Sequence, residues 1–435
     1  MANNSTLKFT TLPAEMLQVI ACQVQKKRDL LSLSLVSKAV HDVFLQAYLW
    51  RSVSLEICEG RLDSFPCFAP NSAFLNYTRD VHFSSEFVRN IEERCPHFHQ
   101  HGNDSGEGDI DQGEDDNDHS EDDVGSSADG CFDILGKGAT SVLNQLQPGT
   151  LRSLSWDTGT CLPIRIFGGE GIIERKKQQR IESLSITTDC TCYETPDFVK
   201  GGLETLTNLK RLRWRAPDCD DIHTLSDMIH TNAKTLKYLE IDLVNWERFG
   251  YYCHRNPYDD GPRGLEHWMR FWRVPEGKFW DPTHAALQTL CLTEVALSRK
   301  SVGVFDFSVL RTLRLRNCES WDSFLEHAVG LHLPIGLKTL EITAKPGLLS
   351  CGADEVLLRF LEAFGGLEGL YVGIEGPLLL NELWPGVIAH RATLKRFVHH
   401  QRGEGVHPHL TQEVDADLLL DPGDAFLQTF DRFPT

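Results

Sequence analysis

Residues 310–318 read Leu-Arg-Thr-Leu-Arg-Leu-Arg-Asn-Cys, with leucine at the first, fourth and sixth positions. Side chains alternate between the two faces of an extended chain, so Leu313 and Leu315 are expected inside, with Arg314 and Arg316 outside. The same apolar template starts again at Leu151, Ile181, Leu209, Leu236, Leu287, Leu337, Leu367 and, more weakly, Leu394. Successive starts are 23–30 residues apart, with one step of 51 residues. Such a period predicts a repeat protein in which each repeat contributes one short strand.

The segments between these windows carry apolar residues at helical spacing, because they recur at intervals of three and four. Two such sets are Trp321, Phe324, Leu325 and Ala328, and Ile222, Leu225, Met228 and Ile229. One strand and one helix in each repeat, stacked side by side, predict an α/β fold: a curved solenoid with a parallel strand face on its concave side. A partial window at Thr78 is expected to start the array.

The windows resemble leucine-rich repeats, and Cys318 fills the ninth position of its window as in the cysteine-type form of that repeat. The other windows are degenerate at this position, where they carry Asp189, Pro217, Val244 or Val295. The resemblance implies a leucine-rich-repeat solenoid over residues 131–400. Residues 56–100 are then a connecting segment with the first partial repeat, and residues 401–435 are either a cap or a tail.

The amino-terminal stretch predicts three short helices over residues 12–51. Pro13 fits a first helical turn, where its missing N–H costs no bond, and Glu15 faces the positive end of that helix. Apolar residues recur at helical spacing at Leu12, Met16, Val19 and Ile20, and at Leu30, Leu33, Val36 and Val40. Three helices of this size bury little core by themselves, so an exposed apolar face on them indicates a partner.

The same stretch resembles an F-box over residues 10–55, after a tail of residues 1–9. The motifs that carry the resemblance are Leu12-Pro13-x-Glu15-x-Leu17-x-x-Ile20, Asp29-Leu30-Leu31, Leu33-Ser34-Leu35-Val36-Ser37-Lys38 and Leu49-Trp50-Arg51. The resemblance implies a substrate receptor of cullin-RING ubiquitin ligases, whose F-box binds the Skp adaptor. It makes the following residues adaptor-facing or interface-supporting: Leu12, Pro13, Leu17, Ile20, Leu30, Leu31, Val36 and Trp50. The alternative is a three-helix cap that belongs to the core of the repeat domain.

The net charge of −19, from 43 basic and 62 acidic residues, argues against nucleic-acid binding, because that affinity rests on neutralising phosphates. Residues 102–130 hold twelve of the acidic residues and no Lys or Arg. Residues 101–130 are therefore expected to be a disordered acidic insertion, because such a composition buries too little apolar surface to fold. A docking segment for a basic partner is the alternative.

The expected cellular compartment follows from the lack of a membrane-spanning stretch and of a signal peptide in the sequence. No apolar stretch reaches the 18 or more residues that span a membrane, and the start does not resemble a signal peptide. Thirteen cysteines in such a chain are expected to be reduced thiols, which is typical of the cytoplasm or nucleus. The sequence therefore predicts a cytoplasmic or nuclear protein with no membrane partner.

The outward positions of the central windows predict a substrate-binding face, because guanidinium groups suit carboxylate or phosphate groups on a partner. Its residues are Arg211, Arg213, Arg215, Tyr238, Arg314 and Arg316. The alternative is a solvated strand face in which arginines pair with Glu240 and Asp242. Residues 243–286 form an insertion with ten aromatic residues, either a packed lobe or a second recognition surface.

The candidate cofactor and metal motifs in the sequence do not match the patterns that such sites require. Gly136-Lys137-Gly138 lacks the spacing and the hydroxyl residue of a phosphate-binding loop. A metal at Cys95, His97, His99 and His101 is less favoured than solvated side chains beside the acidic run. No catalytic, metal or cofactor site is expected. The sequence predicts a non-enzymatic adaptor that recruits an unknown protein for ubiquitin-dependent degradation; the alternative is a leucine-rich-repeat scaffold that uses its F-box without directing degradation.

Overall fold

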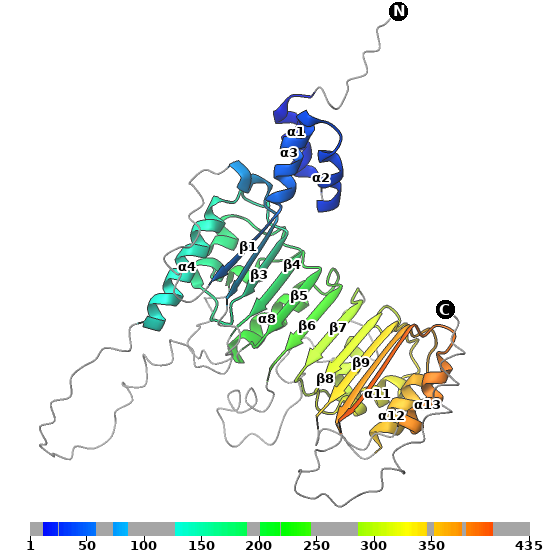
Figure 1. The fold of residues 1–435 in the computed structure, drawn as a ribbon. Coiled ribbons are helices and arrows are strands. Elements are labelled where there is room, and N and C mark those ends of the chain that lie inside the picture. The colour runs from blue at the N-terminus through cyan, green and yellow to red at the C-terminus, as the bar shows by residue number, and fades with distance from the viewer. Residues whose placement is uncertain are drawn as a thin grey trace, which may run out of the picture. The chain divides into compact units, whose positions relative to one another are not determined.

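The computed structural model of the chain (Figure 1) describes residues 12–24, 26–57, 73–85, 127–188, 201–217, 219–244, 286–345, 352–375 and 380–402. It divides into two compact units, Met1–Thr224 and Leu225–Thr435. Each unit places parallel strands in chain order, with helices between them. This arrangement confirms the expected α/β architecture of three helices followed by strand–helix repeats.

Three helices occupy the amino-terminal stretch, as the sequence predicts: α1 (Ala14–Gln23), α2 (Lys27–Ser34) and α3 (Lys38–Leu49). Helix α1 begins directly after Pro13, whose carbonyl accepts the N–H of Leu17 at 3.1 Å. Ser37 caps α3, because its hydroxyl accepts the N–H of Val40 at 3.3 Å and so satisfies a donor that the helix leaves open. These contacts fix where α1 and α3 start.

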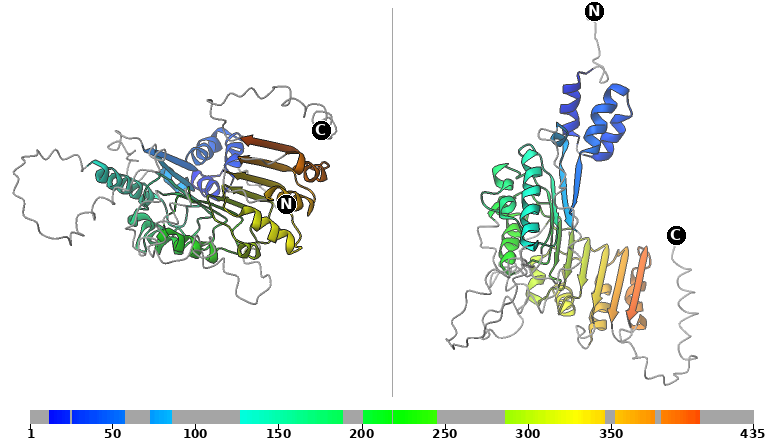
Figure 2. Two further views of the ribbon diagram at one scale, coloured as in Figure 1. Left: turned by 90° about the horizontal axis from the view of Figure 1, so that it is seen from below. Right: turned by 60° about the vertical axis from the view of Figure 1, so that its left-hand side comes forward.

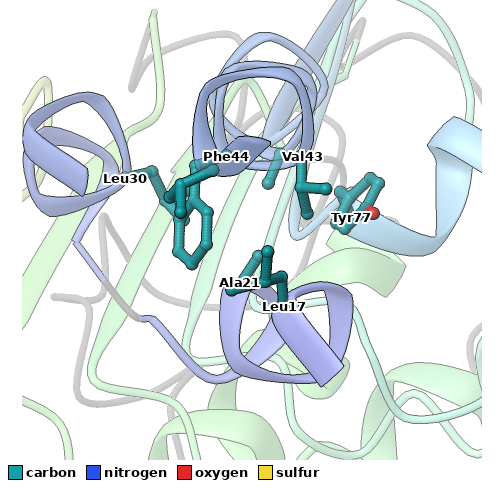
Figure 3. Close-up of a cluster of buried hydrophobic side chains, with 8 residues drawn as sticks. Leu17, Ala21, Leu30, Val43, Phe44 and Tyr77 are labelled. Carbon is teal, nitrogen blue, oxygen red and sulfur yellow. The ribbon is translucent and has the colours of Figure 1, made fainter. Parts of the chain in front are cut away.

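The core of the three helices is completed by a side chain from outside them (Figure 3). Its buried members are Leu17, Ala21, Leu30, Val40, Val43, Phe44, Ala47 and Tyr77. Tyr77 ends the 3-10 helix η3 (Ala73–Tyr77), which precedes the second strand. The next residue adds a polar tie, because the Thr78 hydroxyl donates to the Trp50 carbonyl at 2.9 Å. The helices therefore pack against the start of the repeat array.

Five parallel strands lie in the described part of unit 1, each paired with the one before it: β1 (Ser52–Ile57), β2 (Asp80–Ser85), β3 (Ser153–Asp157), β4 (Ser183–Thr187) and β5 (Arg211–Arg215). Its helices are α4 (Ser127–Gln145), α5 (Ile164–Phe167), α6 (Ile172–Arg175) and α7 (Gly201–Glu204), and α8 (Cys219–Thr231) holds the division between the units. Helices α4 to α7 lie on one side of the strands (Figure 2). The inward side chains, such as Leu154, Trp156 and Ile186, are buried against them.

Unit 2 repeats this plan. Its described strands are β6 (Tyr238–Asp242), β7 (Thr289–Thr293), β8 (Thr312–Arg316), β9 (Thr339–Ala344), β10 (Gly369–Glu375) and β11 (Arg396–Arg402). Its helices are the 3-10 helix η8 (Arg299–Val304), α11 (Trp321–Gly330), α12 (Ala353–Glu362) and α13 (Leu380–Ala389). The window residues Leu313 and Leu315 are fully buried, as the alternation predicts.

Most of the described strands are aligned by the residue that precedes the neighbouring strand. The carbonyl of Arg152 accepts the N–H groups of Glu182 and Ser183 at 2.8 and 3.1 Å. The carbonyl of Glu182 then accepts those of Lys210 and Arg211 at 2.7 and 3.0 Å. The same double acceptance recurs in unit 2 at Lys237, Gln288, Arg311, Lys338 and Glu368. This carbonyl ladder sets the register of these strands from the neighbouring strand alone.

Three boundaries differ from those expected. The strand stack begins one strand before the window at Thr78, because Val53 and Leu55 of β1 are buried in register with Val81 and Phe83. With Trp50 these residues match the apolar spacing of a window, but that window overlaps the Leu49-Trp50-Arg51 motif of the F-box resemblance. Helix α4 begins at Ser127, inside the stretch assigned to the acidic insertion. Strand β11 continues to Arg402, past the expected end of the solenoid. The rest of the acidic run lies outside the described residues, as does Cys95 with its histidines.

The turn after β8 shows how the cysteine of that repeat is used. Asn317 has a left-handed backbone with φ of 50°, a conformation that asparagine tolerates better than most residues. The buried thiol of Cys318 then donates to the Leu292 carbonyl of β7 at 3.3 Å. Burial raises the pKa of this thiol to about 12, so Cys318 remains a protonated donor at neutral pH.

His390 follows α13 and ties two segments of unit 2 together. Its Nε2 lies 2.9 Å from the Leu361 carbonyl oxygen, and the N–H of Leu367 donates to its Nδ1 at 3.4 Å. These partners require a neutral ring with its proton on Nε2. Burial lowers the pKa of His390, because the charged imidazolium is poorly solvated there.

Unit 2 is therefore expected to lose stability in mild acid. The unfolded chain protonates His390 near about pH 6.5, whereas the folded chain resists protonation, so the unfolded state binds more protons as the pH falls. Between about pH 7.5 and about pH 5.5, the melting temperature of the natural chain should fall more than that of a His390→Gln variant. Glutamine can still donate to Leu361 but does not titrate. Equal pH dependence of the two proteins would show that His390 does not carry this effect.

Candidate protein-binding surfaces

The three amino-terminal helices expose large apolar side chains. In the described part of the chain, eight large apolar side chains are exposed, and six of them belong to this short stretch. The six are Met16, Val19, Leu31, Leu35, Val36 and Leu49, with Leu35 at 77 % and Val36 at 54 % exposed. The other two are Ile164 and Leu331. Apolar surface concentrated in this way indicates a protein interface.

The corner between α2 and α3 presents the most exposed of these side chains. The N–H of Leu35 donates to the Ser32 carbonyl at 3.3 Å and that of Val36 to the Leu33 carbonyl at 3.1 Å, so the chain turns tightly after α2. The ring Nδ1 of His41, in α3, lies 3.1 Å from the Ser34 carbonyl oxygen. These contacts hold Leu35 and Val36 outward instead of letting them collapse onto the helices.

The adaptor-binding residues predicted from the sequence fall into two groups. Pro13, Leu31 and Val36 are exposed and can contact a partner directly. Leu17 and Leu30 are buried, at 1 % and 0 % exposed. Leu12, Ile20 and Trp50 are partly buried and pack on the same core. Contact with a partner at Leu17 and Leu30 is therefore indirect, through the shape of the three helices.

Four exposed apolar residues of this surface were not among the predicted site residues: Met16, Val19, Leu35 and Leu49. In α1, the helical spacing grouped Met16 and Val19 with Leu12 and Ile20, which are partly buried, whereas the buried stripe is Leu17 and Ala21. The two stripes are offset by only one or two residues on the helix. Spacing alone cannot choose between them, because both satisfy a three-and-four repeat.

The carboxylate of Asp157 holds together polar side chains on the outward strand face of unit 1. The hydroxyls of Ser155, Ser185 and Thr187 donate to Asp157 at 2.5, 3.2 and 2.9 Å. The Nε2 of His82 lies 3.2 Å from the same carboxylate. This network links β2, β3 and β4, and the outward positions of β1 to β5 all carry polar side chains. The face therefore suits a polar partner.

The outward face of unit 2 contains two arginines that share one carboxylate. The Nε of Arg314 lies 3.2 Å from Oε2 of Glu341, and the Nε of Arg316 donates to Oε1 at 2.6 Å. The hydrogen bond to Glu341 raises the pKa of Arg316. On β6, the Tyr238 hydroxyl donates to Glu240, and burial raises the pKa of Tyr238. Glu341 thus holds two guanidinium groups in place, and Glu240 on β6 adds a second negative charge close to Arg316.

The predicted substrate-binding residues are divided between the units. Arg211, Arg213 and Arg215 lie on β5 in unit 1, whereas Tyr238, Arg314 and Arg316 lie on β6 and β8 in unit 2. The aromatic-rich stretch 243–286 lies almost wholly outside the described residues. The role of both sets in substrate binding stays a prediction.

In the described part of the chain, no three His, Cys, Asp or Glu side chains come together as a metal site would require. Among the same residues, no helix has the length and apolar character needed to cross a membrane.

Comparison with known proteins bears on the amino-terminal helices. No curated protein matches the chain. Residues 9–56 match the family model for F-box-like domains. The match covers α1, α2, α3 and nearly all of β1, and thus the surface that exposes Leu31, Leu35 and Val36. The amino-terminal stretch of this chain is an F-box-like domain.

Proposed function

We propose that this protein is a non-enzymatic substrate receptor of a cullin-RING ubiquitin ligase. The observation that carries the proposal is an F-box-like domain that exposes six large apolar side chains. F-box domains generally bind the Skp adaptor, which links them to the cullin. In this role the chain contributes binding surfaces, and the ubiquitin-transfer chemistry belongs to other subunits.

The adaptor is expected to cover the α2–α3 corner. Leu31, Leu35 and Val36 supply exposed apolar surface there, and burying it stabilises a complex by about 25 cal/mol per Å² before the costs of association. The buried residues Leu17 and Leu30 support this corner indirectly, because they belong to the core that holds the three helices together. The proposal therefore assigns contact to the exposed residues and support to the buried ones.

The strand faces are expected to bind the protein to be ubiquitinated. Their outward side chains are mainly polar, and Glu341 orients Arg314 and Arg316 before any partner arrives. Preorganised guanidinium groups lose less conformational freedom on binding, and they match carboxylate or phosphate groups. A substrate with an acidic or phosphorylated segment fits this face.

Replacing both arginines with alanine should weaken substrate binding by about 30-fold or more, because losing a desolvated charged contact costs about 2–5 kcal/mol. Adaptor binding should persist. A matched control is Arg299→Ala with Arg359→Ala, since these arginines also share one carboxylate, that of Glu326, but lie on the helical side. Measured affinities for a purified substrate decide the matter. Equal loss in both variants would mean that net charge, not this face, governs binding.

Affinity purification from cells tests the function as a whole. The full chain should retrieve the Skp adaptor and a cullin, together with proteins that accumulate when the cullin or the proteasome is inhibited. Recovery of the adaptor with partners whose lifetimes do not change would instead favour a leucine-rich-repeat scaffold. Failure to recover the adaptor at all would overturn the proposed function.

A further inference from the structure

The residues that directly precede the strands of unit 2 form a row of mostly basic side chains. In strand order they are Lys237, Gln288, Arg311, Lys338, Glu368 and Lys395, here called the strand-start row. The carbonyl ladder joins each to the next by an N–H···O=C bond of 2.8 or 2.9 Å. Strands β6 to β9 point the same way (Figure 1), so the row follows the edge at which they begin. Four of its six residues are basic, whereas the whole chain has 43 basic residues in 435, so composition does not account for the row.

The basic side chains of this row reach the surface. Lys237 and Arg311 are exposed. The side chains of Lys338 and Lys395 are 45 % and 74 % exposed. Glu368, the one carboxylate among the six residues, lies 2.7 Å from Nζ of Lys395 and 3.6 Å from Nζ of Lys338. Four positive charges against one negative charge leave the row clearly positive.

Two of the basic side chains also connect neighbouring repeats. Nη1 of Arg311 donates to the Gly336 carbonyl at 2.7 Å, and Nζ of Lys338 donates to the Gly366 carbonyl at 3.0 Å. A guanidinium group has five N–H donors and an ammonium group has three, so these bonds leave donors that a partner can use. They also hold both charges at the edge before a partner arrives, which reduces the conformational freedom lost on binding.

Unit 1 carries the same pattern at the corresponding positions. The residues that precede β1 to β5 are Arg51, Arg79, Arg152, Glu182 and Lys210. Here Glu182 accepts from Arg152 at 3.3 Å and from Lys210 at 2.7 Å, as Glu368 does from its two lysines. A glutamate between two basic residues therefore recurs at the same place in both units, which a chance cluster of surface charges would not do.

The geometry of the strand-start row favours a single extended chain with acidic side chains. Neighbouring strands lie about 4.8 Å apart, so the row from Lys237 to Lys395 spans about 24 Å, the length of about seven extended residues. Beside its middle lie the hydroxyl groups of Thr289, Thr312 and Thr339, which can donate to the same carboxylates. A charged row one residue wide suits one chain better than the broad phosphate surface of a membrane. The net charge of −19 also opposes a nucleic acid.

We propose that the strand-start row binds an acidic segment of the protein to be ubiquitinated. The identity of this partner rests on the proposed function, whereas the binding itself does not. Arg311 leads directly into β8, which carries Arg314 and Arg316, so a segment bound at the row can continue onto the strand face. The attraction of opposite charges would also speed association and weaken with added salt.

Binding of a fluorescent polyglutamate peptide to the full chain at low salt tests this assignment, with polyglutamine as the uncharged reference. Lys237→Gln with Lys395→Gln, the row variant, should weaken binding about fivefold or more, because two exposed charges are lost together. Glutamine suits the position, since Gln288 already occupies it. Gln288→Lys should instead strengthen binding about twofold or more. Lys300→Gln with Arg359→Gln is the matched control, because it removes the same charge from exposed side chains outside the row and should leave the affinity unchanged.

Four results would overturn the proposal. Equal loss in the row variant and in its control would mean that the net charge of the chain governs binding. Full binding by the row variant would place recognition elsewhere, on the strand face if Arg314→Ala with Arg316→Ala abolishes it. A DNA duplex or an anionic-lipid vesicle that binds the row more tightly than polyglutamate would assign the row to that class of partner. Peptide binding that strengthens when residues 102–126 are deleted, but not in the row variant, would assign the row to the chain's own acidic run.

These measurements separate the strand-start row from the proposed function. None of them uses the adaptor or ubiquitin transfer, so a failure here leaves the substrate-receptor role standing. Conversely, a chain that fails to recover the adaptor from cells can still bind polyglutamate through the row.

Discussion

Replacing Leu35 and Val36 with aspartate is expected to lower the affinity for the Skp adaptor by about 100-fold or more. Both side chains are exposed, so the substitutions should leave the fold intact, but an adaptor that covers them would bury two unpaired carboxylates. The measurement is adaptor affinity with purified proteins, together with the melting temperature of each variant. Leu30 is unsuitable for this test, because its side chain is fully buried and a charge there would disrupt the helices themselves.

A matched control for this pair is Leu331→Asp, an exposed apolar residue of unit 2 directly after α11. It adds negative charge without touching the F-box-like domain, so adaptor affinity should stay the same. If the Leu35 and Val36 variant binds the adaptor as tightly as the natural chain, the α2–α3 corner is not the contact surface. Met16 and Val19 on α1 would then be the next candidates.

Tyr77→Ala should loosen the three amino-terminal helices, although Tyr77 lies outside them. The ring is 5 % exposed and fills their common core, and deleting a buried aromatic side chain typically costs about 3–5 kcal/mol. Hydrogen exchange of α1 and α3 amides should accelerate, and adaptor affinity should fall as the surface loses its shape. Tyr77→Phe is the control, because it keeps the ring and removes only the hydroxyl.

Truncated fragments test independently whether the three helices need the residues that follow them. A fragment that ends at residue 60 lacks Tyr77 and the Arg79 guanidinium, one N–H of which donates to the Cys22 carbonyl at 3.5 Å. It should form poorly protected helices, whereas a fragment ending at Ser85 should hold them. If the shorter fragment is as well protected as the longer one, the helices form a self-sufficient core and the packing against η3 is incidental.

The repeat architecture could be predicted because its signal is redundant. Each window carries the same inward residues, and one damaged window does not hide the period of the others. The F-box-like stretch could be predicted for a different reason, since its Leu-Pro start and closing Leu-Trp-Arg are specific local motifs. Both signals lie within short segments, where spacing in sequence corresponds to spacing on a strand or helix.

The features of the core and of the candidate surfaces that the sequence did not predict depend on contacts between segments that are distant in the chain. Tyr77 reaches the helical core from beyond the F-box-like stretch, and the Asp157 network draws its hydroxyls from two strands and its imidazole from a third. Leu35 lies in a turn, where helical spacing no longer predicts the buried side. These features depend on tertiary packing, which overrides local patterns.

The carbonyl ladder has a consequence for how this chain tolerates added material. Because nine of the eleven described strands are aligned by two bonds to the residue before their neighbour, the length of chain between those strands does not affect the alignment. Strands β2 and β3 keep their register although residues 86–152 lie between them, and the entropic cost of such a loop grows only slowly with length. Extra sequence can therefore enter these connections without shifting the strands downstream. We expect related chains to differ mainly in their connections, and a reporter peptide inserted within residues 101–126 to leave both strand faces as they are.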